Sequence, residues 1–532
     1  FVDHRCQHYW NHLHELHAVS AQLRAPQNPI TKFKKPHCGG GCIKLIYGMS
    51  FLKKIALLAS GLGYFLNQSP LFAEDHLRGT RPNIVFFLAD DQSFPDHAIN
   101  GNTKVPAPAT LAFSKQALVF DRAYTGQAVC APSRSMLYSG LYPIRNGCFL
   151  NHYSVRSGVK TIAAYLRELD YQVILAGKSH VNPRSQFPWS EHMNPVRESG
   201  LPRPVIPLAE MDRFIANSGD QPFCMIVASE YPHGPYIKDT PFTASDIQMP
   251  PYLPSTKGNL KRATQYYASI AQKEKEFQAV LDLLKQHKRE SDTLVLYADD
   301  HGADMGKFSV SDRGLRVAFM ARWPGKIQTG RTAALTSFAD FVPTAIELAG
   351  GTVPENLDGK SLLPVLSGRT SKHHDYVYGV SHNQGIQRRS VFPQRSVHDG
   401  RYHYVRNFNS MERIERERAS GKAINYFLER GAKEHGLPEE QLFDTQADPF
   451  EFKNLAENPL LAETKARLEA ALFAWMEQQN DHLSEDGAIT LFAVKKHSLN
   501  QTEEQFNYVV PEQHSGPVAG LVDPHASTQP NP

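Results

Sequence analysis

The segment AVCAPSRSMLYSG, residues 128–140, contains a cysteine and an arginine whose spacing could support nucleophilic chemistry. Cys130 precedes Arg134 by four positions, in a loop that leads into a predicted helix. A thiol at a helix N-terminus beside a guanidinium has a lowered pKa, which favours the reactive thiolate. A free cysteine more commonly packs as a small buried thiol, so both interpretations stay open. The thiolate loop of a phosphatase is a poor match, because it needs several glycines and a longer cysteine-to-arginine spacing.

Four apolar runs end in acidic, basic or histidine residues, which predicts buried strands that deliver polar groups at one end. The runs lie in the stretches RPNIVFFLADD, YQVILAGKSH, PFCMIVASEYPHGP and DTLVLYADDHG. Their chemical groups are Asp90, Asp91, Lys178, His180, His233, Asp299, Asp300 and His301. In a parallel sheet, ligands bind beyond the carboxyl ends of the strands, so these groups are expected to meet there. For any single run, an ordinary polar turn residue is the alternative.

Three carboxylates and one imidazole, from Asp90, Asp91, Asp300 and His301, would form an oxygen-rich site. Such a site suits a hard divalent cation, Ca2+ or Mg2+, better than a thiolate-seeking metal. A single Asp-Asp pair more often serves as a strand-end turn or a helix cap. Two acidic strand ends together predict a metal site.

Lys178, Lys307 and Arg134 would add positive charge beside this metal site, which predicts an anionic substrate. His180 and His233 have the chemistry of a general acid and a general base. Each of these residues taken alone could be a solvated surface or loop residue. Their joint occurrence with the acidic strand ends favours the catalytic interpretation.

Apolar runs alternate with helical periodicity over residues 80–370, which predicts an α/β domain with a large, mostly parallel sheet sandwiched by helices. Residues 371–482 contain alternating aromatic and basic residues and then an amphipathic helix, which predicts a smaller domain with an antiparallel sheet. Residues 483–532 form a polar tail. The net charge of +3 over 532 residues, without a basic helix, excludes a nucleic-acid partner.

Residues 49–73 have the pattern of a secretory signal peptide, with a charged start, an apolar run and a small residue, Ala73, at the cleavage position. We therefore expect a secreted or periplasmic protein without a stable membrane anchor after cleavage. An uncleaved anchor is the alternative, although the apolar run is short for a membrane span. Residues 1–48 are interpreted as a non-native or upstream leader.

Motifs along residues 80–480 resemble, in order, those of the type I, formylglycine-dependent sulfatases. The signature is CAPSRSMLYSG, and the metal and histidine elements are LADDQ, GKSH, PHGP and ADDHG. DFVPTAIELAG, LDGKSLLPVLSG and LFDTQADPFEFKNLAENP resemble later segments of the same family. The resemblance implies the alkaline-phosphatase-like sulfatase fold with a smaller C-terminal domain.

The resemblance also implies a set of site residues. Cys130 would be converted to Cα-formylglycine (3-oxoalanine) by a formylglycine-generating or anaerobic sulfatase-maturating enzyme, and its hydrate would be the nucleophile. One Ca2+ ion would be bound by Asp90, Asp91, Asp300, His301 and the modified Cys130. Arg134 would orient the hydrate, Lys178 and Lys307 would hold the sulfate, His233 would protonate the leaving group, and His180 would help the second hydroxyl to expel sulfate.

Within the family, RNGCFLNHYSV, GKSHVNP and SHNQGIQRRSVFPQRSVHDGRYHYVRNF resemble the N-sulfoglucosamine sulfohydrolase (sulfamidase) branch. Five residues of the second domain are candidates for contacting sugar hydroxyls or a second anionic group, with ordinary surface charge as the alternative: His382, Arg388, Arg389, Arg395 and His398.

The function expected from the sequence is a secreted, calcium-dependent sulfatase, acting on sulfate esters or sulfamates of a sulfated saccharide, in an exo manner. A phosphate or phosphonate monoester hydrolase of the same superfold is the first alternative. A catalytically silent carbohydrate-binding relative is the second.

Overall fold

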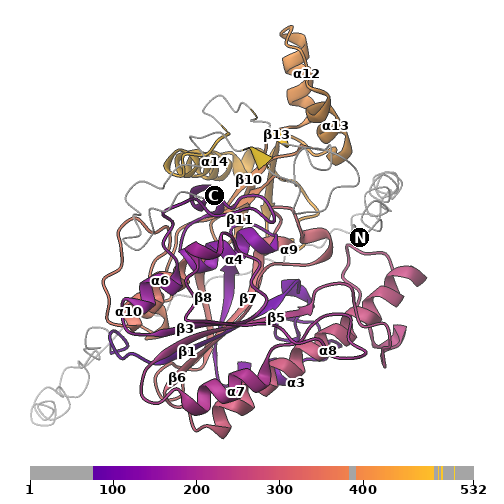
Figure 1. Ribbon diagram of the computed structural model, residues 1–532. Helices are drawn as coiled ribbons and strands as arrows, with labels where there is room; N and C mark the ends of the chain where they lie inside the picture. The colour runs from indigo at the N-terminus through magenta and orange to yellow at the C-terminus, as the bar shows by residue number, and fades with distance from the viewer. Residues whose placement is uncertain (1–75, 383–390, 484–488, 490–492, 495–507, 510–532) are drawn as a thin grey trace, which may run out of the picture. The chain divides into compact units, whose positions relative to one another are not determined.

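The structure is a computed structural model that describes residues 76–382, 391–483, 489, 493–494 and 508–509 (Figure 1). The predicted leader (1–48), the predicted signal peptide (49–73) and nearly all of the predicted tail (483–532) lie outside the described residues. Within the described part of the chain, no helix combines the length and the apolar character needed to cross a membrane.

The largest sheet has eight strands, and its four strands β3, β5, β1 and β6 are adjacent and parallel. Its order is β4 (Glu191–Met193), β3 (Gln172–Gly177), β5 (Phe223–Pro232), β1 (Asn83–Asp90), β6 (Thr293–Asp299), β7 (Arg316–Arg322), β2 (Leu118–Tyr124) and β8 (Gly330–Ser337). Among these eight, β7 alone runs opposite to the others. The predicted large, mostly parallel sheet is therefore confirmed.

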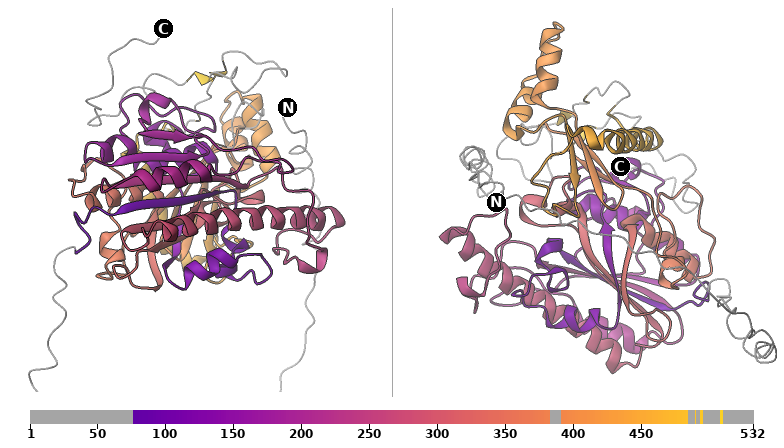
Figure 2. Two further views of the ribbon diagram at one scale, coloured as in Figure 1. Left: turned by 60° about the horizontal axis from the view of Figure 1, so that its bottom comes forward. Right: turned by 180° about the vertical axis from the view of Figure 1, so that it is seen from behind.

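Strand β1 is buried along its whole length, because helices cover both faces of the sheet (Figures 1 and 2). Its even-numbered residues, such as Phe86, share a core with α4 (Cys130–Ser139), α6 (Ile162–Arg167) and α10 (Phe341–Leu348). Its odd-numbered residues, such as Phe87, share a second core with α3 (Pro108–Ser114), α7 (Leu208–Asn217) and α8 (Lys257–Gln286). The unbroken apolar run NIVFFLA thus reflects burial on two faces, as expected of a parallel strand.

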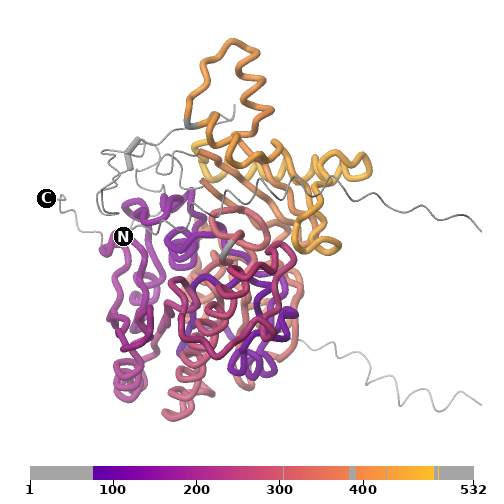
Figure 3. Tube along the Cα trace, turned by 90° about the vertical axis from the view of Figure 1, so that its right-hand side faces the viewer, coloured from indigo at the N-terminus to yellow at the C-terminus, as the bar shows by residue number. Residues whose placement is uncertain are grey.

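A second sheet of four antiparallel strands follows in the sequence, within the part of the chain that is coloured orange to yellow in Figure 3. Its order is β12 (Glu440–Asp444), β11 (Tyr402–Asn407), β10 (Gln394–His398) and β9 (Val377–Ser381). Helix α14 (Ala462–Gln478) packs against β10 and β11, while α12 (Met411–Ala419) pairs with α13 (Tyr426–His435). The predicted smaller antiparallel sheet with a helix is confirmed.

Three short α-helices and one short strand pair remain among the described residues, besides several 3-10 turns. They are α5 (Pro143–Asn146), α9 (Asp312–Leu315), α11 (Leu363–Leu366) and the strand pair β13 (Ala493–Val494) and β14 (Tyr508–Val509).

The antiparallel sheet is joined to the loop that precedes α4. The Val380 N–H in β9 donates a hydrogen bond of 2.8 Å to the Gly126 carbonyl. The Ser381 hydroxyl donates one of 2.6 Å to the carbonyl of Phe308, the residue after Lys307. Strand β9 therefore supports the loop that leads to Cys130 and the loop that carries Lys307.

Candidate active site

Four parallel strands deliver their polar ends to one region, as the sequence predicted. Asp90 is the last residue of β1, and Asp300 directly follows β6. Lys178 directly follows β3, and His233 directly follows β5. Because β3, β5, β1 and β6 are neighbours in the sheet, these groups lie beside one another.

Gly177 allows the backbone before Lys178 to approach the next strand closely. Its φ is +105°, and a Cβ atom at this position would lie 2.3 Å from the Ala228 carbonyl oxygen. That carbonyl accepts a 2.9 Å hydrogen bond from the Lys178 N–H. A side chain at position 177 would force these strands apart and displace Lys178.

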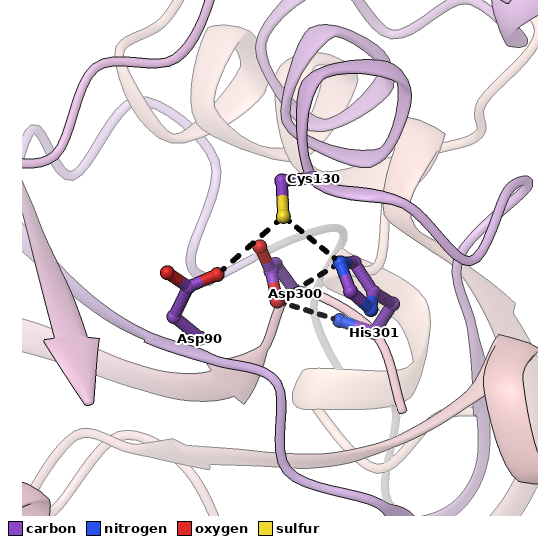
Figure 4. A group of neighbouring side chains, drawn as sticks. All are labelled: Asp90, Cys130, Asp300 and His301. Atoms are coloured by element: carbon purple, nitrogen blue, oxygen red, sulfur yellow. Dashed lines mark hydrogen bonds and ion pairs between the residues drawn. The ribbon is translucent and has the colours of Figure 1, made fainter. Parts of the chain in front are cut away.

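Cys130 is the first residue of the buried helix α4, and it lies at the centre of the site (Figure 4). Its Sγ atom is 3.2 Å from Nε2 of His301, 3.7 Å from Oδ1 of Asp90 and 3.7 Å from Nζ of Lys307. Burial by itself raises the pKa of Cys130, but Lys178, Lys307 and His301 hold that pKa well below its usual range. The pocket therefore stabilises negative charge at position 130.

Two fully buried carboxylates, from Asp90 and Asp300, lie beside Cys130. Arg134, one helical turn after Cys130, bridges them: Nε is 3.1 Å from Asp300 Oδ2, and one terminal nitrogen is 3.4 Å from Asp90 Oδ1. Burial and the nearby Asp90 raise the pKa of Asp300 to about 7. Burial also raises the pKa of Asp90, but Lys178 at 2.5 Å outweighs it and holds that pKa well below its usual range.

The ligand atoms of Asp90, Cys130, Asp300 and His301 all lie within 4.8 Å of one another. Asp91 completes this group of acids, since its carboxylate is 3.2 Å from His301 Nε2. Burial by itself lowers the pKa of His301, but Asp300 raises it to about 9. Asp299, the other aspartate of the ADDHG motif, instead pairs with His97 at 2.7 Å.

The basic groups lie against the acids. Lys307 Nζ is 2.7 Å and 2.9 Å from the two carboxylate oxygens of Asp91. His233 Nε2 lies 3.4 Å from Lys307 Nζ and 3.5 Å from Asp91. The structure thus brings Lys307 and His233 to the same acidic edge.

His180 is half-buried and contacts a second histidine. Burial is the main reason that its pKa is lowered to about 4, and Cys130 and Lys178 lie close enough to influence it. Its Nε2 atom is 2.8 Å from Nδ1 of His152. His180 is therefore neutral near pH 7.

Several residues of the site have left-handed backbone conformations, which are strained for residues other than glycine. The φ angles are +66° for Asp91, +52° for His180, +63° for His152 and +66° for Phe308. Such conformations persist where the surrounding structure fixes them, and they cluster at functional sites. The surrounding structure therefore fixes the backbone of these four residues in and beside the site.

Sequence reasoning gave no role to two residues that contact its predicted histidines. His152 contacts His180, and Arg203 forms a short contact with Nδ1 of His233. His152 lies within the RNGCFLNHYSV motif, but nothing in that motif indicates its partner. Arg203 is thirty positions before His233, so no local pattern joins them.

The second-sheet residues predicted to contact the sugar are mostly committed to internal contacts. Arg395 is fully buried and pairs with Asp481 at 2.5 Å and 2.7 Å, and it also reaches His382, which is buried. His398 is buried and contacts the hydroxyls of Tyr124 and Thr445. His382, Arg395 and His398 thus make internal contacts, and their contact with a sugar stays a prediction. Arg388 and Arg389 lie outside the described residues.

Two family models match the chain. Residues 82–351 match the sulfatase model, and residues 301–419 match the model of the C-terminal region of N-sulphoglucosamine sulphohydrolase.

Individual proteins agree with this assignment. An ulvan-active sulfatase from Formosa agariphila is 44% identical over 411 residues, which cover 76% of this chain and 82% of that protein. The N-sulphoglucosamine sulphohydrolase of Homo sapiens is 22% identical over 469 residues, which cover 75% of this chain and 90% of that protein.

Two solved structures share the fold. One is a protein in complex with its substrate D-glucosamine-2-N,6-O-disulfate, with a TM-score of 0.59 and 17% identity, covering 76% of this chain and 99% of that chain. The other is a phosphonate monoester hydrolase from Silicibacter pomeroyi, with a TM-score of 0.59 and 19% identity, covering 77% of this chain and 99% of that chain.

The resemblance predicted from the motifs, including that to the sulfamidase branch, is confirmed. The chain belongs to the sulfatase family and is a sulfuric ester hydrolase.

Proposed function

We propose that this enzyme removes sulfate groups from a sulfated polysaccharide, or from oligosaccharides derived from it. The similarity to an ulvan-active sulfatase supports a polysaccharide of the ulvan type. The single observation that carries the proposal is the position of Cys130, which is buried, lies 3.7 Å from Lys307 Nζ, and has Lys178 near enough to lower its pKa. Two ammonium groups around one buried position suit a sulfate group at its point of attack.

We further propose that Cys130 is the precursor of formylglycine, made by a maturating enzyme. Cys130 is a free cysteine at the start of α4, within the CAPSR sequence. Formylglycine would supply an oxygen nucleophile in its hydrated form. The low pKa of Cys130 indicates that the same pocket would favour an ionised hydroxyl at this position.

A divalent cation, Ca2+, fits the same pocket. Asp90 and Asp300 are fully buried, and their ligand atoms lie within 4.8 Å of one another and of those of Cys130 and His301, a spacing that one cation could span. Burial, together with the nearby Asp90, raises the pKa of Asp300, and a bound cation would relieve both costs. Asp90, Asp91 and Asp300 would hold the cation with oxygen ligands, with His301 beside them. A bound cation would neutralise charge on sulfate oxygens.

The remaining site residues would have separate roles toward the substrate. Lys178 and Lys307 would neutralise the sulfate oxygens, while Arg134 holds Asp90 and Asp300 in place through its bridge. His233 is 3.4 Å from Lys307, so it would lie beside the bound sulfate and would donate a proton to the leaving oxygen. We also propose that the protein is exported, in line with its signal-peptide pattern.

Sulfate release from defined ulvan oligosaccharides, measured by ion chromatography, tests the proposal. Heparan, chondroitin and carrageenan oligosaccharides are the comparison substrates, and they also separate N-sulfate from O-sulfate cleavage. Matched aryl sulfate and aryl phosphate esters test the alternative of a phosphate or phosphonate hydrolase. Faster phosphate release than sulfate release would contradict the proposed function.

A further inference from the structure

Asn151 and His152 form a chain of hydrogen bonds that begins beside Cys130 and ends on His180. The Asn151 Oδ1 atom accepts a hydrogen bond of 3.4 Å from the N–H of Ala131, the residue after Cys130. The Asn151 Nδ2 atom is 3.2 Å from His152 Nε2. His152 Nδ1 is 2.8 Å from His180 Nε2.

The donors and acceptors of these groups allow only one direction for this series of hydrogen bonds. A backbone N–H only donates, so the atom of Asn151 that faces Ala131 is its oxygen. The amide nitrogen of Asn151 must then face His152, where it donates to Nε2. With Nε2 of His152 accepting, the proton of its ring lies on Nδ1.

His180 accepts the last hydrogen bond of this series. Nδ1–H of His152 donates to Nε2 of His180, so that nitrogen carries no proton. The ring proton of His180 then lies on its other nitrogen, Nδ1. That atom is buried and lacks a geometrically ideal hydrogen-bond partner among the described residues, while the Cys130 side chain lies close enough to His180 to interact with it.

We propose that Asn151 and His152 are positioning residues that hold His180 in the tautomer with its proton on Nδ1. His180 then offers an N–H donor to an oxygen at the reaction centre, which rests on the proposed function: a sulfate oxygen of the substrate or an oxygen at position 130. This hydrogen bond transfers no proton. In the resting enzyme, His180 therefore acts as a hydrogen-bond donor, a role that comes before the help in expelling sulfate that the family resemblance implies.

The tautomer can be observed directly in the full chain labelled with 15N-histidine. Two-bond 1H–15N correlation spectra distinguish protonated from unprotonated ring nitrogens, and a His180→Gln variant identifies the His180 signals. We expect a protonated Nδ1 and an unprotonated Nε2. The opposite assignment would overturn the proposal, whether or not the protein hydrolyses any sulfate ester.

Two variants of His152 separate positioning from simple packing. Its φ of +63° suits both asparagine and glycine, so neither His152→Asn nor His152→Gly adds backbone strain. The asparagine side chain keeps an N–H near the position of Nδ1, whereas glycine removes it. We expect His152→Gly to lower kcat about 10-fold or more with little change in KM, and to mix the His180 tautomers.

His152→Asn should keep kcat within about threefold of the wild type and preserve the His180 tautomer. The exposed His76 provides a matched control, and His76→Asn should change neither quantity. An unchanged kcat in His152→Gly, or equal losses in both His152 variants, would overturn the proposal. If no sulfated substrate is turned over, the proposed function fails, while the spectra still decide the tautomer.

Discussion

The residue at position 130 is surrounded by groups that favour a negatively charged side chain over a neutral thiol. Lys178, Lys307 and His301 together hold its pKa low, although the helix around it is buried. Such an arrangement suits an oxyanion as well as a thiolate, because its stabilising groups act on charge rather than on sulfur. At the scale of residues, one prediction concerns the nucleophile at position 130, and a second concerns a cation bound by the carboxylates beside it.

Replacing Cys130 by serine should abolish sustained sulfate release, with a fall of about 1000-fold or more. Serine has a single hydroxyl, so a sulfate ester formed on it would have no internal route of release. Steady-state sulfate release by Cys130→Ser and wild type measures the effect, and the melting temperature checks that the fold is kept. Mass spectrometry of the wild-type peptide should show an aldehyde or its hydrate. Full activity in the serine variant would contradict the proposed nucleophile.

Removing divalent cations should lower both activity and stability, because Asp90 and Asp300 are buried close to each other. A ligand that binds only the folded state at about 100 times its Kd adds about 2.7 kcal/mol to the free energy of unfolding. Treatment with EGTA, followed by Ca2+, should lower and then restore the melting temperature. Asp90→Asn is the matched control, and its melting temperature should respond less. A wild type insensitive to the chelator would argue against a metal.

At the scale of elements, the loop after β6 and the short helix α9 pack backbone against backbone. A Cβ atom on Gly314, within α9, would lie 2.1 Å from the Gly306 carbonyl oxygen and 2.8 Å from the Cβ of Ala128. Ala128 precedes Cys130 by two residues, and Gly306 directly precedes Lys307. Small residues at these contacts therefore fix the distance between two parts of the site.

Gly314→Ala should destabilise the protein by about 1–3 kcal/mol, because the added methyl group has no space. It should also lower kcat, since relief of the clash moves the loop that carries Lys307. Gly258→Ala is the control: a Cβ there meets no atom within 4 Å, and the position lies in α8. The control should gain about 0.4–1 kcal/mol. Urea unfolding measures both, and equal stability of the two variants would contradict this interpretation.

At the scale of the whole molecule, Glu276 makes stability depend on pH from outside the site. It lies on α8, is buried, and accepts a 2.6 Å hydrogen bond from the Ser229 hydroxyl in β5. Burial raises the pKa of Glu276 to about 8. The folded protein therefore keeps a proton on Glu276 at pH values where the unfolded chain has lost it.

Because of this proton, the free energy of unfolding should fall as the pH rises. Between about pH 5 and pH 7, Glu276 should lower the free energy of unfolding by about 1.4 kcal/mol for each unit of rising pH. Glu276→Gln should remove this slope and be more stable than the wild type at pH 7. The exposed Glu415 on α12 is the control, and Glu415→Gln should keep the wild-type slope. Urea unfolding from pH 5 to pH 8 provides the measurement.

Local patterns were sufficient to predict the elements that carry the site. The apolar runs before Asp90, Lys178, His233 and Asp300 predicted strands, and all four are strands of one sheet. Pattern alone could not give the roles of Arg395 and His398, because burial depends on what the rest of the chain packs against them. Their basic character was consistent with sugar contacts and with ordinary surface charge, and it did not indicate the internal contacts that the structure shows.

The sequence by itself determined the fold class, the family and the chemical types gathered at the strand ends, because these depend on residue order and periodicity. Tertiary structure decided which of two adjacent aspartates faces Cys130: Asp300 does, while Asp299 pairs with His97. It also decided that His152 and Arg203 touch the predicted histidines. Contacts between distant segments and the direction of hydrogen bonds depend on how the chain packs, and no local pattern encodes that packing.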